Sequence, residues 1–539
     1  MTRVARALGR RGSSRLSLGV DAALAVALGA VYSLPFVWTG AWPLQLLIVA
    51  WLAGRAARVA PARAGLIGAL FGTAWLAAGT WWLFISLHWY GGLPALLAVA
   101  AVLLLSAFLA LYLALALAAF ARWRSRHGGH GNGDGDGDGG GDRSGCDALL
   151  FAALWLLSEL ARGVIFTGFP WLASGYAYID SPLAGLAPWL GVYGLGFVAA
   201  ALAAWPVLSF MQAGAAAPVP AVRRLLPLAA LAVALGAGAG IGPGQFTVPS
   251  GTLRVTLLQG DVAQEEKFAQ ALMPQALAWT RRQLLAARGD LVLAPETVIP
   301  LLPDQLDPGY WRALTEHFQG AGQAALIGLP LGDEGVGYTN SAAGLSAQTA
   351  ALPGGFYRYD KHHLVPFGEF IPLGCRWCTQ LMNIPLGDFN RGPVGPASFA
   401  FRGERIGANI CYEDLFGEEL AARFGNAAQA PTMFANLSNI GWFGDTIAID
   451  QHLQISRFRS LEFQRPMLRA TNTGATAVID HHGRVTHALP RFTQGVLDAS
   501  VQGRTGLTPF AWWAAHFGLW PLALGAVALI AGLRRTRRR

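Results

Sequence analysis

Long apolar segments dominate the first 243 residues of this chain, and one more lies near its C-terminus. A helix needs ~20 predominantly apolar residues to cross the hydrocarbon core of a bilayer. Because 53% of the residues are hydrophobic and only 13% are charged, a wholly soluble protein would be unusual. The sequence therefore predicts a multi-span α-helical membrane bundle with eight spans. We place them at residues 17 to 33, 37 to 54, 64 to 87, 94 to 121, 147 to 166, 183 to 210, 225 to 243 and 514 to 533.

Arginine residues mark one side of this predicted bundle. They follow the second, fourth, sixth and eighth spans, whereas the opposite loops at 34 to 36, 88 to 93 and 167 to 182 contain neither Lys nor Arg. In membrane proteins the cytoplasmic loops carry the excess of basic residues. We therefore expect both termini in the cytoplasm. The long insert between the seventh and eighth spans is then expected on the far side of the membrane, facing the periplasm or the cell exterior.

Residues 128 to 145, between the fourth and fifth predicted spans, consist mostly of Gly and Asp. Such a composition cannot bury a core, so we expect a disordered cytoplasmic linker. The Asp-Gly repeat that begins at Asp134 is similar to the start of a calcium-binding loop. Gly145 stands where that loop requires a bidentate Glu, so no calcium site is predicted.

The formal net charge of +9 does not indicate a nucleic-acid partner, because the arginines lie beside apolar segments and not along an aromatic, polar face. Cys375 and Cys378 form a lone C-x-x-C motif. Without a second pair zinc is not expected, and a local disulfide and two free thiols remain equally open. The adjacent His362 and His363 would point opposite ways on an extended segment. We therefore expect neither a metal nor a cofactor.

Residues 244 to 511 have an ordinary globular composition and alternate short apolar runs with helical ones. This pattern predicts an α/β domain inserted between residues 1 to 243, with seven spans, and residues 512 to 539, with the eighth span and a basic tail. Strands are expected at 253 to 258, 291 to 294, 325 to 329, 406 to 410, 432 to 435, 467 to 470 and 476 to 480. Helices are expected at 271 to 287, 309 to 319, 414 to 424 and 451 to 464.

Cys411 ends one of these apolar runs and directly precedes the acidic pair Glu413 and Asp414. A sharp turn from strand to helix would expose its thiol near backbone N–H groups, which can stabilise an oxyanion or lower a thiol pKa. A buried structural cysteine is the alternative at this position, because free Cys is among the most buried residue types.

Two other stretches of the sequence favour the interpretation of Cys411 as a catalytic nucleophile. Glu296 ends the apolar run at 290 to 297, and Lys361 lies in the run from 359 to 369. Glu, then Lys, then Cys after a strand resembles the nitrilase (carbon-nitrogen hydrolase) superfamily over residues 252 to 500. This resemblance implies a four-layer αββα sandwich and a catalytic triad of Glu296, Lys361 and Cys411.

Further motifs indicate one particular family within this superfamily. With the eight predicted spans, they make the chain similar to the apolipoprotein N-acyltransferase family, which completes bacterial lipoprotein maturation. Ile440-Gly441 departs from that pattern, since Asp-Ala would be expected there. The motifs are Phe169-Pro-Trp-Leu, Leu364-Val-Pro-Phe-Gly-Glu369, Cys411-Tyr-Glu413, Asn439-Ile-Gly-Trp-Phe-Gly-Asp445, Gln451-His-Leu-Gln454 and Arg469-Ala-Thr-Asn-Thr-Gly474.

The resemblance implies an acyl transfer in two steps with two lipid partners. Cys411 would attack the sn-1 ester of a phospholipid and form a thioester. The free α-amino group of the diacylglyceryl-cysteine of an apolipoprotein would then accept the acyl chain. Glu296 would act as the base, and Lys361 would stabilise the thiolate and the oxyanion.

Other residues near the triad are candidates for supporting roles. The resemblance implies that Glu369 and Glu413 support the triad by orienting Lys361 or the incoming amine, and a helix-start or surface carboxylate is the alternative for each. We expect Asn340 and Tyr412 to line the pocket.

Three further features lie closer to the membrane. Trp442 and Phe443 are expected on a mobile flap that meets the membrane, with core packing as the alternative. Glu159 and Arg162 are three residues apart in the fifth predicted span, which favours an ion pair. The loop after them, from 167 to 181, is aromatic and neutral, as expected at a membrane interface.

Two other functions remain open at this stage. A membrane-anchored amidase with the same triad would hydrolyse a periplasmic amide, although one span would suffice to anchor it. A transporter with an incidental soluble domain is the second alternative, but repeat symmetry and paired broken helices are not detectable in the membrane part.

Overall fold

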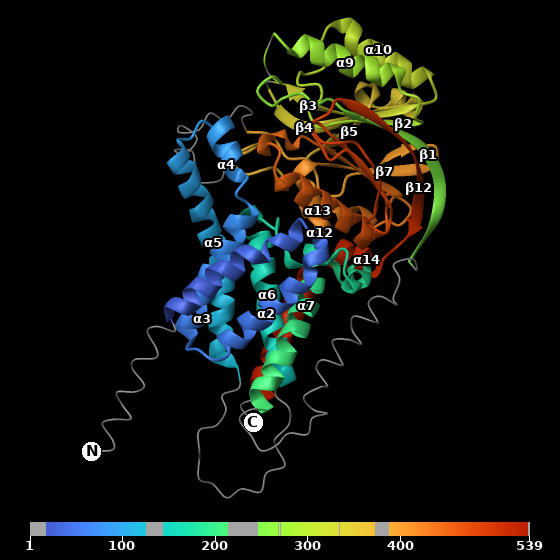
Figure 1. Cartoon of the computed structure of the whole chain (residues 1–539). Coiled ribbons are helices and arrows are strands. Elements are labelled where there is room, and N and C mark those ends of the chain that lie inside the picture. Colours follow the sequence, from blue (N-terminus) through green and yellow to red (C-terminus); the bar gives the residue numbers. More distant parts are fainter. Residues whose placement is uncertain are drawn as a thin grey trace, which may run out of the picture.

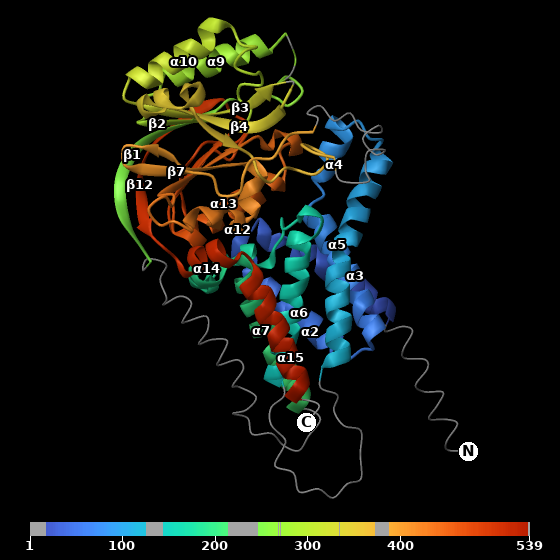
Figure 2. The same cartoon turned by 180° about the vertical axis from the view of Figure 1, so that it is seen from behind.

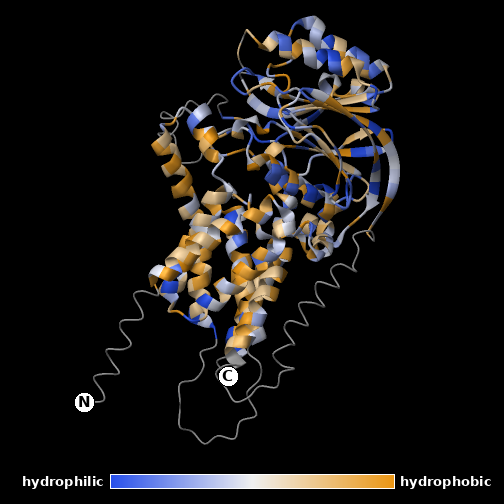
Figure 3. Cartoon of the chain, in the orientation of Figure 1, coloured by the Kyte–Doolittle hydropathy of each residue, from blue (hydrophilic) through white to orange (hydrophobic). Residues whose placement is uncertain are grey.

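The computed structural model describes residues 18–124, 144–213, 246–267, 269, 271–333, 335–371 and 388–536. A helical bundle forms one end of the molecule and a β-sandwich the other (Figure 1). The bundle is mostly hydrophobic, with hydrophilic stretches in a few places, whereas the sandwich mixes hydrophilic and hydrophobic residues throughout (Figure 3). The molecule therefore consists of an apolar helical part and a β-sandwich of mixed composition.

Within the described residues, five helices are long and apolar enough to cross a membrane. They are Leu18–Phe36, Pro61–Gly79 (α3), Ala95–Trp123 (α5), Ser144–Thr167, which contains α6 (Ser144–Val164), and Pro182–Met211, which contains most of α7 (Ala187–Ala213). A bent pair, α14 (Pro509–Phe517) and α15 (Trp520–Thr536), makes six if it is counted as one span. A multi-pass bundle is thus confirmed. The span predicted at 225 to 243, and the linker as far as residue 143, lie outside the described residues.

Three predicted spans differ from the helices observed. The second is α2 (Trp42–Ala56), whose 15 residues reach only about 22 Å. The third ends at Gly79, after which the chain forms the short helix α4 (Leu83–Ile85) and a π-helical turn at Ser86–Tyr90. The eighth is not straight, because α14 and α15 meet at 89° and Gly518 between them has a φ of 56°. Each of the three predicted spans is thus interrupted by turns, which for α2 are the 3₁₀ turns Leu34–Phe36 and Thr39–Ala41 before it.

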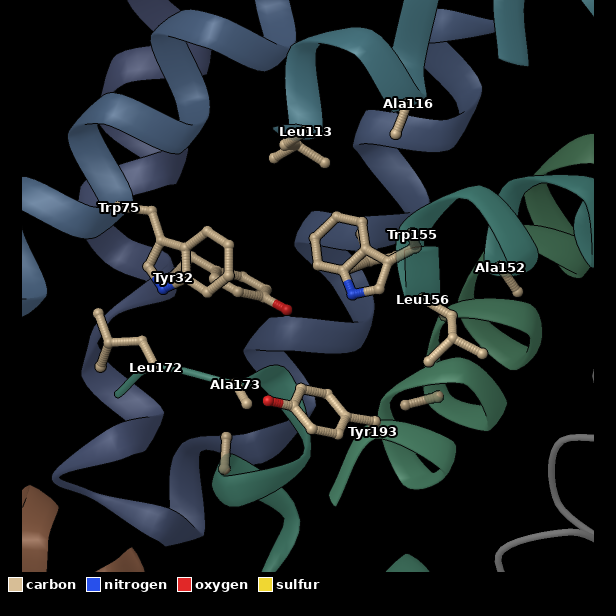
Figure 4. Close-up of a cluster of buried hydrophobic side chains, with 14 of the residues drawn as sticks. Tyr32, Trp75, Leu113, Ala116, Ala152, Trp155, Leu156, Leu172, Ala173 and Tyr193 are labelled. Atoms are coloured by element: carbon tan, nitrogen blue, oxygen red, sulfur yellow. The ribbon is translucent and has the colours of Figure 1, made fainter. Parts of the chain in front are cut away.

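Aromatic side chains fill the centre of the bundle (Figure 4). Tyr32 meets the ring of Trp75 edge-on, with 4.9 Å between centroids, and Trp75 stacks on Trp155 at 6.2 Å. Helices α3 and α5 approach closely at Gly72, where an added Cβ would lie 2.8 Å from the Ala110 side chain. Small residues allow such close helix packing within a bilayer.

The predicted ion pair of Glu159 and Arg162 is present, with 3.6 Å between its charged atoms, and both residues are buried. Its main contacts are with the loop that follows α6. Glu159 accepts hydrogen bonds from the backbone N–H and the hydroxyl of Ser174, and Arg162 donates to the carbonyls of Phe169 and Leu172. The pair therefore fixes the aromatic loop at the end of the bundle nearest the sandwich.

Twelve strands form two six-stranded mixed sheets in the described residues. In spatial order the first sheet contains β12 (Gly495–Gly506), β1 (Thr247–Gln259), β2 (Leu291–Ala294), β3 (Ala324–Asp333), β4 (Gly337–Leu345) and β5 (Tyr357–Asp360). The second contains β11 (Val485–Ala488), β10 (Ala477–Ile479), β9 (Met467–Thr471), β8 (Met433–Ser438), β7 (Glu404–Ile410) and β6 (Phe399–Phe401). The inner strands β1, β2 and β3, and likewise β7, β8 and β9, are parallel, and the outer pairs are antiparallel.

The two sheets pack face to face through a shared apolar core that includes Leu257, Leu293, Ala408 and Leu437. Helices α9 (Met273–Ala286) and α10 (Pro308–Gly320) cover the outer face of the first sheet (Figures 1 and 2). Helices α12 (Gly417–Ala421) and α13 (Ile447–Phe463) lie against the second sheet. The layering is the αββα sandwich expected from the resemblance to the nitrilases.

Helix α13 also belongs to the bundle. Its residues Ile455, Phe458 and Leu461 are buried in the same apolar cluster as the aromatic centre of the bundle. The helix therefore lies between the second sheet and the membrane part (Figure 2). One apolar core runs from the bundle into the sandwich.

The prediction of one continuous helix at residues 414 to 424 is wrong. A 3₁₀ turn at Cys411–Leu415, the short helix α12 and a second 3₁₀ turn at Ala422–Phe424 take its place. Phe416, between the first two, has φ −105° and ψ 79°, which no helix allows. The Glu413 carboxylate accepts the backbone N–H of Ile410, which draws the turn back onto the strand before it.

Candidate active site

The three residues of the predicted triad all follow strands of the sandwich. Glu296 comes two residues after β2, Lys361 directly follows β5, and Cys411 directly follows β7. The Lys361 ammonium lies 3.2 Å from Oε1 of Glu296. Cys411 lies close enough for the charges of Glu296 and Lys361 to act on its thiol. The fold thus brings together residues that are up to 115 positions apart in the chain (Glu296 to Cys411).

Asn340 and Glu369 complete the polar surroundings of Lys361. Glu369 places Oε1 at 2.8 Å from the ammonium. The side-chain amide of Asn340, on β4, donates to Oε1 of Glu296 at 2.8 Å and to Oε1 of Glu369 at 2.6 Å. Two predicted supporting residues therefore lie in direct contact with the predicted triad.

Glu296 is held in its ionised form. Burial alone would raise its pKa, but Lys361, the Asn340 amide, Lys267 and the backbone N–H of Asn439 together hold the pKa below its ordinary value. The Asn439 N–H donates to Oε2 at 2.8 Å, so both carboxylate oxygens have partners. The group is charged at neutral pH and can accept a proton.

The pKa values of Lys361 and Cys411 are both raised, so both groups stay protonated. Burial would lower the pKa of Lys361, yet Glu296 and Glu369 raise it above its ordinary value, so the ammonium stays charged. Burial and the Glu296 carboxylate raise the pKa of the Cys411 thiol to about 12, although Lys361 acts the other way. The resting cysteine is therefore a neutral thiol beside an ionised carboxylate, which is the arrangement that general-base activation requires.

The backbone of Cys411 is strained. Its φ is 50°, a left-handed value that few non-glycine residues adopt. Such conformations cluster at functional sites because the surrounding structure must hold them. The side chain remains partly exposed, so the turn presents the thiol at the edge of the core.

Glu413 binds backbone groups of the segment that carries Lys361. It accepts the N–H groups of His362 at 2.8 Å and His363 at 3.2 Å, and the hydroxyl of Tyr359 at 2.6 Å. Together with its hydrogen bond from Ile410, these contacts tie the turn at Cys411 to the segment at Lys361. Glu413 is thus a buried carboxylate that holds two segments together. It lies within the 3₁₀ turn at Cys411–Leu415 described above.

Tyr412, Trp442 and Phe443 lie where the sandwich meets the bundle. The Tyr412 hydroxyl donates to the carbonyl of Gly168 at 3.1 Å. Phe443 packs on Trp82, with 4.4 Å between ring centroids, and Trp442 meets Tyr90 at 5.5 Å. Phe443 is thus packed against an aromatic ring of the bundle, as the alternative of core packing predicts. The mobility of a flap that contains Trp442 and Phe443 stays a prediction.

The two histidines beside Lys361 have partners within the protein. His362 Nδ1 lies 2.7 Å from the carbonyl of Gly392, and His363 Nδ1 lies 2.9 Å from Glu419 and its ring stacks on Phe416. Cys375 and Cys378 lie outside the described residues.

Sequence reasoning missed Lys267. This residue is buried, and its ammonium donates to the backbone carbonyl of Glu296 at 3.1 Å. Burial lowers its pKa to about 8 against the opposing effect of Glu296. In the sequence it follows two glutamates, a pattern typical of a solvated surface, so only the fold could reveal its position.

This protein is a membrane-bound member of the carbon-nitrogen hydrolase class. The features that define the class are the two mixed sheets, the Glu-Lys-Cys arrangement at strand ends and the multi-span bundle. Family models agree with both parts: the apolipoprotein N-acyltransferase N-terminal domain matches residues 28–205, and carbon-nitrogen hydrolase matches residues 255–510. The chain belongs to the apolipoprotein N-acyltransferase family.

Curated relatives of that name match along nearly the whole chain. The protein of Verminephrobacter eiseniae is 53% identical over 92% of this chain and 92% of its own length. That of Ralstonia nicotianae is 46% identical over 96% and 94%, and that of Bordetella bronchiseptica 43% over 96% and 97%.

Solved structures match about half of this chain at low identity. The NitFhit protein of C. elegans is 16% identical, with a TM-score of 0.35, and the match covers 51% of this chain and 65% of that one. A carbon-nitrogen hydrolase from Helicobacter pylori is 14% identical, with a TM-score of 0.33, over 50% and 94%.

Proposed function

We propose that this protein transfers an acyl chain from a phospholipid to the free α-amino group of the diacylglyceryl-cysteine of apolipoproteins. The observation that carries the proposal is the buried contact of Glu296 with Lys361 beside the Cys411 thiol, in a chain whose relatives carry this activity in their name. The roles of the three residues follow from their protonation states.

In the first step Glu296 takes the thiol proton as the Cys411 sulfur attacks the sn-1 ester carbonyl of the phospholipid. The tetrahedral oxyanion is stabilised by the Lys361 ammonium, which Glu369 and Glu296 keep protonated. The ester C–O bond then breaks, and the Glu296 carboxyl returns its proton to the departing oxygen. A thioester on Cys411 and a lysophospholipid result.

In the second step the neutral α-amine of the apolipoprotein attacks the thioester carbonyl. Glu296 accepts a proton from the amine, the C–S bond breaks, and the proton passes to the departing Cys411 sulfur. The products are an amide and the free thiol. Asn340 supports both steps, because its amide keeps the Glu296 and Glu369 carboxylates in place.

The junction with the bundle suits lipid substrates. Tyr412, next to the nucleophile, donates to the Gly168 carbonyl of the aromatic loop, so the nucleophile lies close to the bundle. Proximity to the bundle would help to keep bulk water from a thioester, which water would otherwise hydrolyse.

We also propose that the chain crosses the bacterial inner membrane eight times, with both termini in the cytoplasm and the sandwich in the periplasm. The arginine distribution supports this orientation. Arg55 near the end of α2 and Arg63 near the start of α3 both pair with Asp21 of the first helix at 2.6 Å, so these helix ends lie at the same side of the bundle.

Mass spectrometry tests the central step. The purified full-length protein is incubated with phospholipid and no acceptor, and the peptide that contains Cys411 is analysed. We expect one acyl adduct that hydroxylamine removes, together with one lysophospholipid per adduct. Lysophospholipid without an adduct, or an adduct on another residue, would contradict the proposal.

Kinetics separate the acyltransferase from the alternative, an amidase that hydrolyses a periplasmic amide. Because donor and acceptor use Cys411 in turn, double-reciprocal plots at several acceptor concentrations should be parallel. The isolated acyl-enzyme should pass its chain to a diacylglyceryl lipopeptide with a free amine and far more slowly to the N-acetylated lipopeptide. Equal discharge by water and by lipopeptide would favour the amidase.

A further inference from the structure

Two neighbouring residues of α13, Gln451 and His452, join the bundle to the nucleophile. Both are buried, at 2% and 0% exposure. Successive residues of an α-helix point about 100° apart, so they contact different neighbours. Gln451 contacts the bundle, and His452 contacts the turn that holds Cys411.

All the polar atoms of the Gln451 side chain bond to the membrane part. Its Oε1 accepts from the indole N–H of Trp171 at 2.7 Å and from that of Trp82 at 3.0 Å. Its amide donates to the carbonyl of Gly79, at the end of α3, at 2.9 Å. These contacts involve two separate segments of the bundle, so Gln451 fixes α13 relative to both.

His452 bonds the backbone of the nucleophile. Its Nε2 lies 3.1 Å from the carbonyl oxygen of Cys411, and its Nδ1 lies 3.3 Å from the Arg469 guanidinium. A guanidinium can only donate, so Nδ1 accepts and the proton of the neutral ring lies on Nε2. His452 therefore donates a hydrogen bond to the Cys411 carbonyl.

A buried network fixes the tautomer of His452. Arg469 also bonds the Asp414 carboxylate at 3.3 Å and the hydroxyl of Ser456, and Ser456 in turn donates to Asp414. Arg469, Asp414 and Ser456 are all fully buried. Asp414 and Ser456 hold Nη1 of Arg469, and the Ala475 carbonyl accepts from its Nε at 3.3 Å. The guanidinium therefore keeps Nη2 directed at Nδ1 of His452.

We propose that His452 is a positioning residue for Cys411 and that Gln451 couples this position to the bundle. The inference rests on the proposed function, because it concerns Cys411 as the nucleophile. The φ of 50° at Cys411 is unfavourable by itself, so the peptide that follows needs partners that hold it. His452 and the amide of Asn436, at 3.3 Å, are the donors to the Cys411 carbonyl. A displacement of α3 or of the aromatic loop would pass through Gln451 to α13 and so to the thiol.

A pair of amide substitutions tests the hydrogen bond from His452. His452→Gln places an N–H where the imidazole Nε2 lies, whereas His452→Asn places one near Nδ1, too short to reach the Cys411 carbonyl. Thioester formation is followed in a single turnover with phospholipid, on the full-length protein in lipid nanodiscs. We expect the Asn variant to acylate about tenfold or more slowly, and the Gln variant to stay within a few-fold of the wild type. The phospholipid concentration for half-maximal rate should be unchanged in both.

A double-mutant cycle tests the coupling. Gln451→Leu should slow acylation about tenfold by itself, but it should add little to His452→Asn, because both act on the same carbonyl. Gln454→Leu, on the same helix, is the matched control. The Gln454 side chain accepts from Arg457 at 2.6 Å, and its loss should leave the acylation rate unchanged.

Each outcome decides the matter. Equal rates for His452→Gln and His452→Asn would overturn the hydrogen-bond role, and fully additive effects of the Gln451 and His452 substitutions would overturn the coupling. A raised half-maximal phospholipid concentration with an unchanged limiting rate would assign both residues to substrate binding instead. Failure of the proposed function is distinguishable, because the wild-type protein would then form no Cys411 thioester at all.

Discussion

Glu296 and Glu369 each place one carboxylate oxygen on the same Lys361 ammonium, at 3.2 and 2.8 Å. The lysine therefore shares its charge between the proposed base and a second carboxylate, to which the proposed mechanism assigns no proton transfer. Glu369 also accepts the backbone N–H of Val365 at 2.8 Å, which anchors it to its own loop. This division of contacts makes the contribution of Glu369 measurable apart from that of Glu296.

Glu369→Gln should slow thioester formation by about tenfold without abolishing it. Without the second carboxylate, Lys361 pairs more fully with Glu296 and makes it a weaker base. The rate is measured in a single turnover with phospholipid in excess. Glu316→Gln is the control, because Glu316 is exposed on α10 and should leave the rate unchanged. A loss as large as that of Glu296→Gln would mean that Glu369 itself transfers the proton.

Substitutions within the proposed triad should be strongly non-additive. Cys411→Ala should abolish transfer, and Glu296→Gln and Lys361→Ala should each reduce it about 10³-fold or more, because the three groups act as one unit. The double variant Glu296→Gln with Cys411→Ala should be no worse than Cys411→Ala. Thermal unfolding checks that each variant is folded. Substantial transfer by folded Cys411→Ala would remove Cys411 from the mechanism.

Glu296→Gln should make the Cys411 thiol more reactive to alkylation even as it stops acyl transfer. The Glu296 carboxylate contributes to raising the pKa of the thiol to about 12, so its neutralisation increases the thiolate fraction at a given pH. Alkylation by iodoacetamide at pH 8 should become about tenfold faster, the effect of one pKa unit. The measurement needs Cys146, Cys375 and Cys378 replaced by Ser. Slower alkylation in the variant would indicate that Glu296 already draws the proton from the resting thiol.

Removal of the Lys267 charge should change the pH dependence of the acylation rate. Acyl transfer requires ionised Glu296, so its rate falls as the pH falls through the pKa of that carboxyl. Lys267 helps to hold this pKa down, and its removal should move the acid limb of the rate profile to higher pH. The acylation rate of Lys267→Met is measured from pH 4 to 8, with Lys267→Arg, which keeps the charge, as the comparison. An acid limb at the wild-type position in Lys267→Met would show that the charge of Lys267 does not reach Glu296.

The strands with continuous apolar runs were predictable from the sequence. Residues 291 to 294 and 406 to 410 are strands as expected, because Leu, Val and Ile there are buried on both faces. β4 was missed, since its Gly337–Leu345 segment is rich in Gly, Ser, Thr and Asn and becomes a strand only between β3 and β5. Asn340 belongs to that strand, so its exact partners depended on a pairing that no local pattern indicates.

Some residues of the candidate site could likewise be predicted from the sequence, and others could not. Glu296, Lys361 and Cys411 could be named because their order resembles a known family, and the structure places Glu296 and Lys361 in contact. Lys267 and His452 could not be assigned, because their partners lie 29 and 41 positions away in the chain and their local sequence is polar. Buried polar contacts of this kind arise from tertiary structure alone.

The position of α13 in both the sandwich and the bundle has a practical consequence for fragments of this protein. If residues 246 to 506 were expressed alone, the side of α13 formed by Ile455, Phe458 and Leu461 would face water instead of the bundle. An apolar surface of that kind drives aggregation. The sandwich is therefore not expected to behave as a free-standing soluble enzyme, and the full-length chain in detergent should unfold in one thermal transition because its two halves share a core.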